Sequence, residues 1–387
     1  MSFRTKAEHC INFVRLSTDS VVEGLPQEQV TSRRNVRQER DISRRAFIRN
    51  ASLAALTVAV GGHKLVNQAV AQENKSIAID CHTHLVRKVG PTFGLTAHYT
   101  WHEYNGDLLV AEMDRAGIDK ALLKSYSSQD LQYVTGKVFP GGIKPGGGGL
   151  DTSEEYMVSY ARKYPDRLLW MDVFNPKDDD MNEWREKIKD PVLRGLAFFP
   201  AEFYPSGYIL THKLYIELLE LAAEQGKKSV LITFEQTPDD EQEIRLGHWV
   251  ELVKRFGKDV KWCLNHGGYW SRPRRRWGQL NRVTLIQAVQ ELNDQFDNIW
   301  FETGEHRENE YPYTEWQTKV NQLAHEIGYD KICFGSDWPY VDNNSKYFQL
   351  WDAVRNHGWW ASDLQKKWFL GENAARFMNL PEAKPLG

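Results

Sequence analysis

The chain alternates short apolar runs with longer segments in which apolar residues recur every three or four positions. Short apolar runs rich in β-branched residues are typical of buried strands, and the three- and four-residue spacing is typical of amphipathic helices. Eight strands are predicted, over residues 76–82, 119–125, 167–174, 194–200, 228–234, 260–266, 298–303 and 331–337. Helices are predicted between them, for example over residues 106–117, 153–164, 212–226 and 284–296.

Eight strands, each followed by a helical segment, within about 250 residues predict a (β/α)₈ TIM barrel of the α/β class. An open, doubly wound sheet fits less well, because no glycine-rich phosphate turn follows the first strand. The glycine cluster at 141–149 lacks the ending of a P-loop, so we interpret it as a loop near the barrel mouth. Residues 350–380 are expected to add C-terminal helices packed on the barrel.

Residues 1–71 are expected to be a leader that lies outside the fold. Arg44 and Arg45 precede a short apolar stretch at 50–62, and an Ala-x-Ala cleavage site ends at Ala71. This layout resembles a twin-arginine signal peptide, and its apolar part is too short to span a bilayer. It predicts a domain over 72–387 that the twin-arginine export machinery delivers to the periplasm or another exported location. The alternative is a disordered basic tail or a retained amphipathic anchor.

Composition narrows the kinds of partner. The net charge is −3, which does not indicate a general nucleic-acid surface. No CxxC pair occurs among the four cysteines, and Cys81, Cys263 and Cys333 fall within predicted strands. These three are therefore expected to be buried, reduced thiols rather than disulfides or metal ligands.

Candidate chemistry lies at the predicted strand ends, where TIM barrels place their active sites. Strand one ends in "IDCHTH", and alternation along a strand puts Asp80, His82 and His84 on one face. Strand six ends at His266 and strand eight ends at Asp337. Because a barrel is closed, strand eight neighbours strand one, and Asp337 should stand beside the two histidines. A carboxylate next to two imidazoles indicates either a metal site or a proton-transfer site.

The motifs "IDCHTH", "NHGG", "FGSDWPY" and "FLGENAARFMNL" resemble the amidohydrolase superfamily, in the branch of aminocarboxymuconate-semialdehyde decarboxylase and several lactonases. The resemblance spans nearly all of residues 77–380. It implies that His82, His84 and Asp337 are metal ligands, with Asp337 also transferring protons. It implies that His266 polarises the substrate or shuttles a proton, and that the protein forms a homodimer, as relatives often do.

One position departs from that family pattern. The family usually ends strand five with a histidine ligand, whereas this chain has Thr233 there, followed two residues later by Glu235. We hypothesise that Glu235 replaces the missing ligand. The alternatives are a metal held by fewer protein groups and no metal at all. Strand four carries no lysine that could be carbamylated, so a site for one divalent ion is expected. Zinc is the first expectation, with manganese and cobalt as alternatives that the same donors accept.

Several loop residues near the predicted mouth are candidates for substrate binding. Arginine forks bind carboxylates in bidentate fashion, which favours an anionic substrate. A solvated loop, or arginines paired with nearby acids, is the alternative. The candidates are Arg272, Arg274, His306, Arg307 and Trp338.

The expected function is therefore metal-dependent hydrolysis of a small ester, lactone or amide that is anionic or contains a ring. Non-oxidative decarboxylation, which the same family also performs, is the alternative. A barrel that only binds a ligand is the alternative from another class, because the strand-five histidine is missing.

Overall fold

The computed structural model describes residues 76–88, 104–125, 150–151, 154–200, 207–234, 242–269, 282–304, 311–339, 346–356 and 362–383. Within these residues, eight parallel strands form one sheet in the order β1-β3-β5-β6-β7-β8-β9-β10. Their bounds are β1 Ile79–Thr83, β3 Lys120–Lys124, β5 Leu168–Val173, β6 Leu193–Phe198, β7 Ser229–Ile232, β8 Lys261–Leu264, β9 Ile299–Glu302 and β10 Ile332–Cys333. Each lies within a strand predicted from the sequence, except that β1 ends one residue later and β6 begins one residue earlier than predicted.

The sheet closes on itself, as the TIM-barrel prediction requires. The last strand, β10, returns to β1 through a parallel bridge between Thr83 and Trp338. Backbone hydrogen bonds run from Cys81 N to Phe334 O (2.9 Å) and from Asp337 N to His82 O (2.8 Å). The (β/α)₈ prediction is confirmed.

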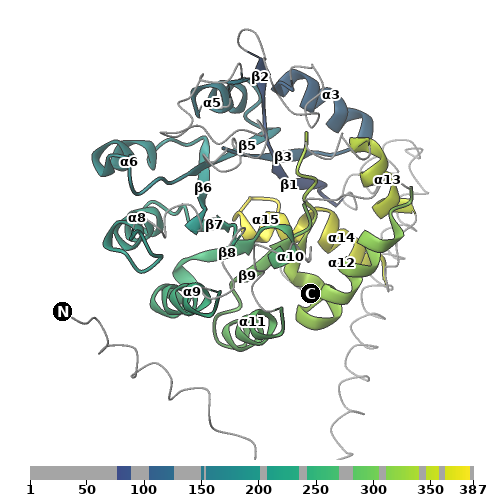
Figure 1. Cartoon of the computed structure of the whole chain (residues 1–387). Coiled ribbons are helices and arrows are strands. Elements are labelled where there is room, and N and C mark those ends of the chain that lie inside the picture. Colours follow the sequence, from purple (N-terminus) through teal and green to yellow (C-terminus); the bar gives the residue numbers. More distant parts are fainter. Residues whose placement is uncertain are drawn as a thin grey trace, which may run out of the picture. The chain divides into compact units, whose positions relative to one another are not determined.

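Helices surround the strands (Figure 1). A short antiparallel pair, β2 (Arg87–Lys88) and β4 (Leu150–Asp151), lies outside the barrel sheet and was not predicted. The helices are α3 Gly106–Ala116, α5 Glu154–Lys163, α6 Met181–Lys187, α8 Lys213–Glu224, α9 Gln242–Phe256, α10 His266–Tyr269, α11 Arg282–Phe296, α12 Thr314–Ile327, α13 Tyr347–Asn356, α14 Asp363–Lys367 and α15 Asn373–Phe377. Short 3₁₀ turns occupy Gly257–Asp259 and Tyr329–Lys331, and a π turn occupies Trp368–Glu372. Among the described helices, none is both long and apolar enough to cross a membrane.

The expected C-terminal helices are present, and α15 closes one end of the barrel. The side chains that fill the barrel interior, such as Ile79, Leu231 and Trp300, form one cluster with Phe377 and other residues of the α15 segment. Ser229 Oγ donates a 2.7 Å hydrogen bond to Phe377 O, which fixes α15 to the start of β7. This is the end at which the strands begin, so the opposite end, where they finish, remains for the site.

The three described cysteines behave as predicted. Cys81, Cys263 and Cys333 are free and fully buried, and all three belong to the interior cluster.

Candidate active site

The end of β1 is shaped by an irregularity that strand alternation alone does not predict. The register with β3 shifts between Asp80 and Thr83. Cys81 therefore points into the interior cluster, whereas Asp80 turns outward and accepts hydrogen bonds from Ser336 N (3.0 Å) and Tyr347 OH (2.9 Å). The expectation that Asp80 shares a face with the two histidines was wrong, because the register shift reverses the alternation between them.

His82 and His84 are buried, and each is held by the Nδ1 atom of its ring. His84 Nδ1 lies 2.7 Å from Lys124 O. Because a carbonyl oxygen only accepts, Nδ1 carries the proton and Nε2 of the neutral ring presents its lone pair. His82 Nδ1 likewise donates to Glu302 Oε1 at 2.9 Å, which leaves its Nε2 as an acceptor as well.

These two acceptor nitrogens face each other. His82 Nε2 and His84 Nε2 are 3.0 Å apart, and Asp337 Oδ1 lies 3.6 Å and 3.3 Å from them. Two lone pairs and a carboxylate oxygen at such distances repel one another unless a cation lies among them. Ligand atoms around a tetrahedral zinc ion with bonds of about 2.0–2.1 Å are about 3.3 Å apart, so His82, His84 and Asp337 fit one divalent ion.

Asp337 keeps its negative charge in this arrangement. Burial acts to raise the pKa of Asp337, but its interactions with His84, His82 and His266 outweigh burial and lower the pKa below the usual range. The backbone of Asp337 has a φ of 60°, a conformation rarely adopted by residues other than glycine. Asp337 is thus held at the end of β10 with its carboxylate beside the Nε2 atoms of His82 and His84.

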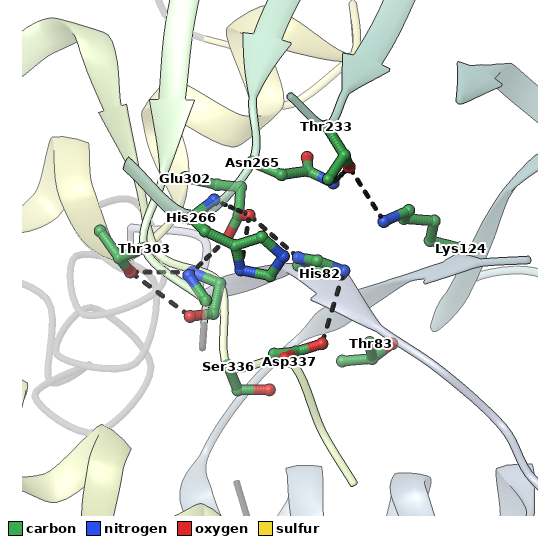
Figure 2. Close-up of polar contacts among 12 residues, drawn as sticks. His82, Thr83, Lys124, Thr233, Asn265, His266, Glu302, Thr303, Ser336 and Asp337 are labelled. Atoms are coloured by element: carbon green, nitrogen blue, oxygen red, sulfur yellow. Dashed lines mark hydrogen bonds and ion pairs between the residues drawn. The ribbon is translucent and has the colours of Figure 1, made fainter. Parts of the chain in front are cut away.

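Glu302, the last residue of β9, contacts both His82 and His266 through its carboxylate. Its Oε1 accepts from His82 Nδ1 and from the backbone N of His266 (2.6 Å), and its Oε2 accepts from Gly304 N (2.5 Å) (Figure 2). A Cβ atom at Gly335 would lie 2.3 Å from Glu302 Oε2, so only glycine allows this approach. Burial raises the pKa of Glu302.

His266 stands beside His82, with 4.9 Å between the ring centroids. It has a φ of 55°, like Asp337 an unusual value for a residue other than glycine. Burial lowers the pKa of His266 to about 4, although the charges of Glu302 and Asp337 act in the opposite direction. The ring is therefore neutral at pH 7, with one nitrogen that donates and one that accepts a proton.

The sequence matches the amidohydrolase family profile over residues 79–380, which includes every group described above. The chain belongs to the amidohydrolase family. No curated protein matches it.

Solved amidohydrolase-like barrels resemble this chain in fold. A probable 2-pyrone-4,6-dicarboxylic acid hydrolase from Acinetobacter baumannii, with citric acid bound, has a TM-score of 0.50 at 13% identity and covers 78% of this chain and 99% of its own. An amidohydrolase from Burkholderia multivorans with bound zinc has a TM-score of 0.51 at 12% identity, covering 79% of this chain and 100% of its own. A manganese-bound 5-carboxyvanillate decarboxylase from Novosphingobium aromaticivorans has a TM-score of 0.49 at 14% identity, covering 79% and 97%. At these identities the likeness concerns the fold alone.

The structure brings together four residues that the sequence singled out. His82, His84, His266 and Asp337 converge at the strand ends of this amidohydrolase. Trp338 lies elsewhere: its fully buried indole packs edge-on against Tyr104, in the core outside the barrel. Its backbone takes part in barrel closure through the bridge to Thr83, and its role in substrate binding stays a prediction. Other predicted site residues lie outside the described part of the chain: Glu235, Arg272, Arg274, His306 and Arg307.

Sequence reasoning missed two buried charged residues at strand ends, Glu302 and Lys124. Both could have been identified by the argument that identified Asp337. Each is a charged residue that ends an apolar run, two positions after a residue of the interior cluster, Trp300 and Leu122 respectively.

Proposed function

We propose that this amidohydrolase is a metal-dependent hydrolase of a small ester, lactone or amide. The observation that carries the proposal is the convergence of His82 Nε2, His84 Nε2 and Asp337 Oδ1 within 3.0–3.6 Å, with both nitrogens presented as acceptors. A bound divalent ion would supply Lewis acidity, which lowers the pKa of water and polarises a carbonyl group. Zinc is proposed, with manganese and cobalt as alternatives for the same donors.

The chain's own residues would perform the proton transfers. Asp337 accepts the proton of the attacking water and delivers it to the leaving group, a role supported by the position of its carboxylate beside His82 and His84. His266, neutral at pH 7, donates a hydrogen bond to the carbonyl oxygen as negative charge develops there. Glu302 holds the His82 ring and the His266 backbone in place for both steps.

Metal analysis is the first test of this proposal. Protein purified without chelator is expected to contain about one zinc or manganese ion per chain, and His84→Ala is expected to lose it. His325→Ala, on the outer helix α12, is the matched control and should retain the metal. Wild-type protein without metal would contradict the metal-dependent reading.

The reaction is tested on a panel of lactones, esters and aromatic carboxylates. Hydrolysis that depends on the added metal supports the proposal. Release of carbon dioxide from a carboxylate, without hydrolysis, would establish the carboxy-lyase alternative instead. Metal without turnover of any compound would favour a barrel that only binds ligand.

The fourth protein ligand is a separate proposal. Glu235 follows Phe234, which closes the described stretch after β7, and its carboxylate is proposed to replace the histidine absent at Thr233. Zinc affinity of Glu235→Ala is the measurement. An affinity equal to that of wild type would show that His82, His84 and Asp337 hold the ion without it.

Export is proposed from the leader at residues 1–71. Cells that express the full chain should release a mature form beginning at Gln72, detectable by mass spectrometry of the exported fraction. Changing Arg44 and Arg45 to lysine should leave the precursor uncleaved if the twin-arginine machinery reads this signal. Processing that is unaffected by the change would exclude that route.

A further inference from the structure

Lys124 places a positive charge inside the barrel mouth. It is the last residue of β3 and is 1% exposed. Leu122, two residues earlier, belongs to the interior cluster, so alternation directs Lys124 inward as well. Its carbonyl oxygen fixes His84 Nδ1, which ties this residue directly to the histidine pair.

The ammonium group of Lys124 is surrounded by residues from three other strand ends. Its Nζ donates to Thr233 Oγ1 at 3.4 Å and lies 4.1 Å from the ring centroid of Phe199. Asn265 Nδ2 donates to the same hydroxyl at 2.7 Å. Figure 2 shows Thr233 between Lys124 and Asn265, on the side of His82 away from Asp337. We call Lys124, Phe199, Thr233 and Asn265 the Lys124 subsite.

The Lys124 charge acts on the catalytic histidines. After burial, it is the next cause that lowers the pKa of His82, and it also contributes to the lowered pKa of His266. Lys124 also contacts the histidine pair through its backbone, because its carbonyl oxygen lies 2.7 Å from His84 Nδ1. Lys124 is the charged member of the subsite, and the remaining three members are uncharged.

An ammonium in such surroundings is suited to an anionic ligand group. Lysine presents a compact charge with three donors, and hydrogen bonds between ionised partners are the stronger class. Thr233 places a hydroxyl beside it, which accepts from Lys124 Nζ and from Asn265 Nδ2. Phe199 supplies an apolar wall on which the carbon skeleton of a ligand can pack.

We propose that the Lys124 subsite binds a carboxylate group of the substrate, adjacent to the bond that is cleaved. This inference rests on the proposed function for the reaction that the substrate undergoes. The binding of a carboxylate by Lys124 does not depend on that reaction. The inference identifies the substrate as a carboxylic acid whose carboxylate lies next to the reacting carbonyl group. It also gives a role to Thr233, which stands where the family usually has a metal-ligating histidine. The Thr233 hydroxyl accepts from Lys124 Nζ and so orients the ammonium group.

Binding of a matched pair of probes tests the subsite without any turnover. Benzoate and benzamide have nearly the same shape and differ in charge, and isothermal titration calorimetry gives the affinity of each for the full chain. Wild type should prefer benzoate, and Lys124→Met should weaken benzoate about tenfold to a hundredfold, since a hydrogen bond to a charged group contributes about 1.5–3 kcal/mol. Benzamide affinity should be unchanged, and Lys124→Arg should keep part of the preference.

Controls separate the subsite from the metal and from the fold. The titrations are repeated after chelator treatment, because a carboxylate could bind the metal, and the preference for benzoate should persist. Thermal melting and metal content of Lys124→Met should match wild type. Equal losses for benzoate and benzamide, unchanged benzoate affinity, or no binding of benzoate by wild type would each overturn the proposal.

Kinetics distinguish failure of this inference from failure of the proposed function. If an ester or lactone is hydrolysed, Lys124→Met should raise KM about tenfold or more for the substrate with a carboxylate, but not for its neutral amide. An equal fall in kcat for both would overturn the proposal and assign Lys124 to the developing oxyanion instead. Selective benzoate binding without any hydrolysis would reject the proposed function and leave the subsite standing.

Discussion

Glu302 Oε1 lies 2.9 Å from His82 Nδ1 and 2.6 Å from the backbone nitrogen of His266. One buried carboxylate oxygen thus fixes both a candidate metal ligand and the residue proposed to polarise the substrate. A carboxylate that accepts from Nδ1 orients the ring and makes Nε2 a better ligand.

We therefore predict that Glu302→Gln weakens zinc binding about tenfold to a hundredfold, the usual effect of losing such a partner. The measurement is competition with a chromophoric chelator. Glu315→Gln, on the exposed surface of α12, is the matched control and should bind zinc as wild type does. Wild-type affinity in Glu302→Gln would mean that His82 is oriented by its packing alone.

Asp337→Asn separates chemistry from folding. The amide keeps the shape of the side chain but cannot take a proton from water, so kcat should fall about a hundredfold to ten-thousandfold, the usual contribution of acid–base catalysis. The melting temperature should change little. Steady-state kinetics on any substrate found by the panel provide the measurement, and retained kcat would exclude Asp337 as the proton carrier.

Substitution of Gly371 tests how closely the C-terminal segment packs against the end of the barrel. A Cβ atom there would lie 2.1 Å from Ile77 O, which is backbone and cannot move aside. Gly371→Ala should therefore destabilise the fold by about 1–3 kcal/mol, the usual cost of overpacking. Gly247→Ala in α9 meets no atom within 4 Å and is expected to be neutral or stabilising by up to about 1 kcal/mol. Denaturant unfolding of both variants would reveal whether the α15 segment is as closely packed as this distance requires.

Asp179 gives a pH dependence remote from the site. Burial raises its pKa above the usual 3.8, and the Asp172 charge adds to the effect, against hydrogen bonds from Asn175 N and Trp184 Nε1. The folded state holds this proton to higher pH than the unfolded chain does. The contribution of Asp179 to the free energy of unfolding is therefore fully present below the pKa that Asp179 has in the unfolded chain. It is lost as the pH rises through the pKa that Asp179 has in the folded state.

Asp179→Asn should remove this decrease of the unfolding free energy with rising pH. Both hydrogen bonds of the carboxylate are accepted by Oδ2, so the amide oxygen of asparagine can keep them without a charge. The unfolding free energy of the variant, relative to wild type, should increase as the pH rises above about 4, the unfolded pKa of an aspartate. A difference that is constant with pH would show that Asp179 titrates alike in the folded and unfolded chain.

The order of strands and the position of the site could be predicted because both depend on local patterns. Apolar runs of the right length marked the eight strands, and closure of the barrel then required Asp337 to adjoin His84. The outward turn of Asp80 could not be predicted, because a register shift depends on how β1 pairs with β3 and leaves no mark in the alternation.

The packing of Trp338 could not be predicted for a related reason. A tryptophan after a strand end looks like a wall of the pocket, but its orientation is set by the bridge from Thr83 and by packing against Tyr104. These partners are more than 200 positions away in the chain. Glu302 and Lys124, in contrast, were accessible, since each ends an apolar run just as Asp337 does.

The contact between β10 and β1 joins the beginning of the described fold to a strand near its end. Ser336 N and Asp80 Oδ1 are linked across 256 positions, and Asp337 lies beside His84 through the same contact. The three donor atoms therefore exist as a set only after the last strand has docked. A cation held there would be a cross-link between two distant parts of the chain, and its affinity would form part of the free energy of folding. A cation bound at the site would then show that β10 has docked on β1 and closed the barrel, even without substrate.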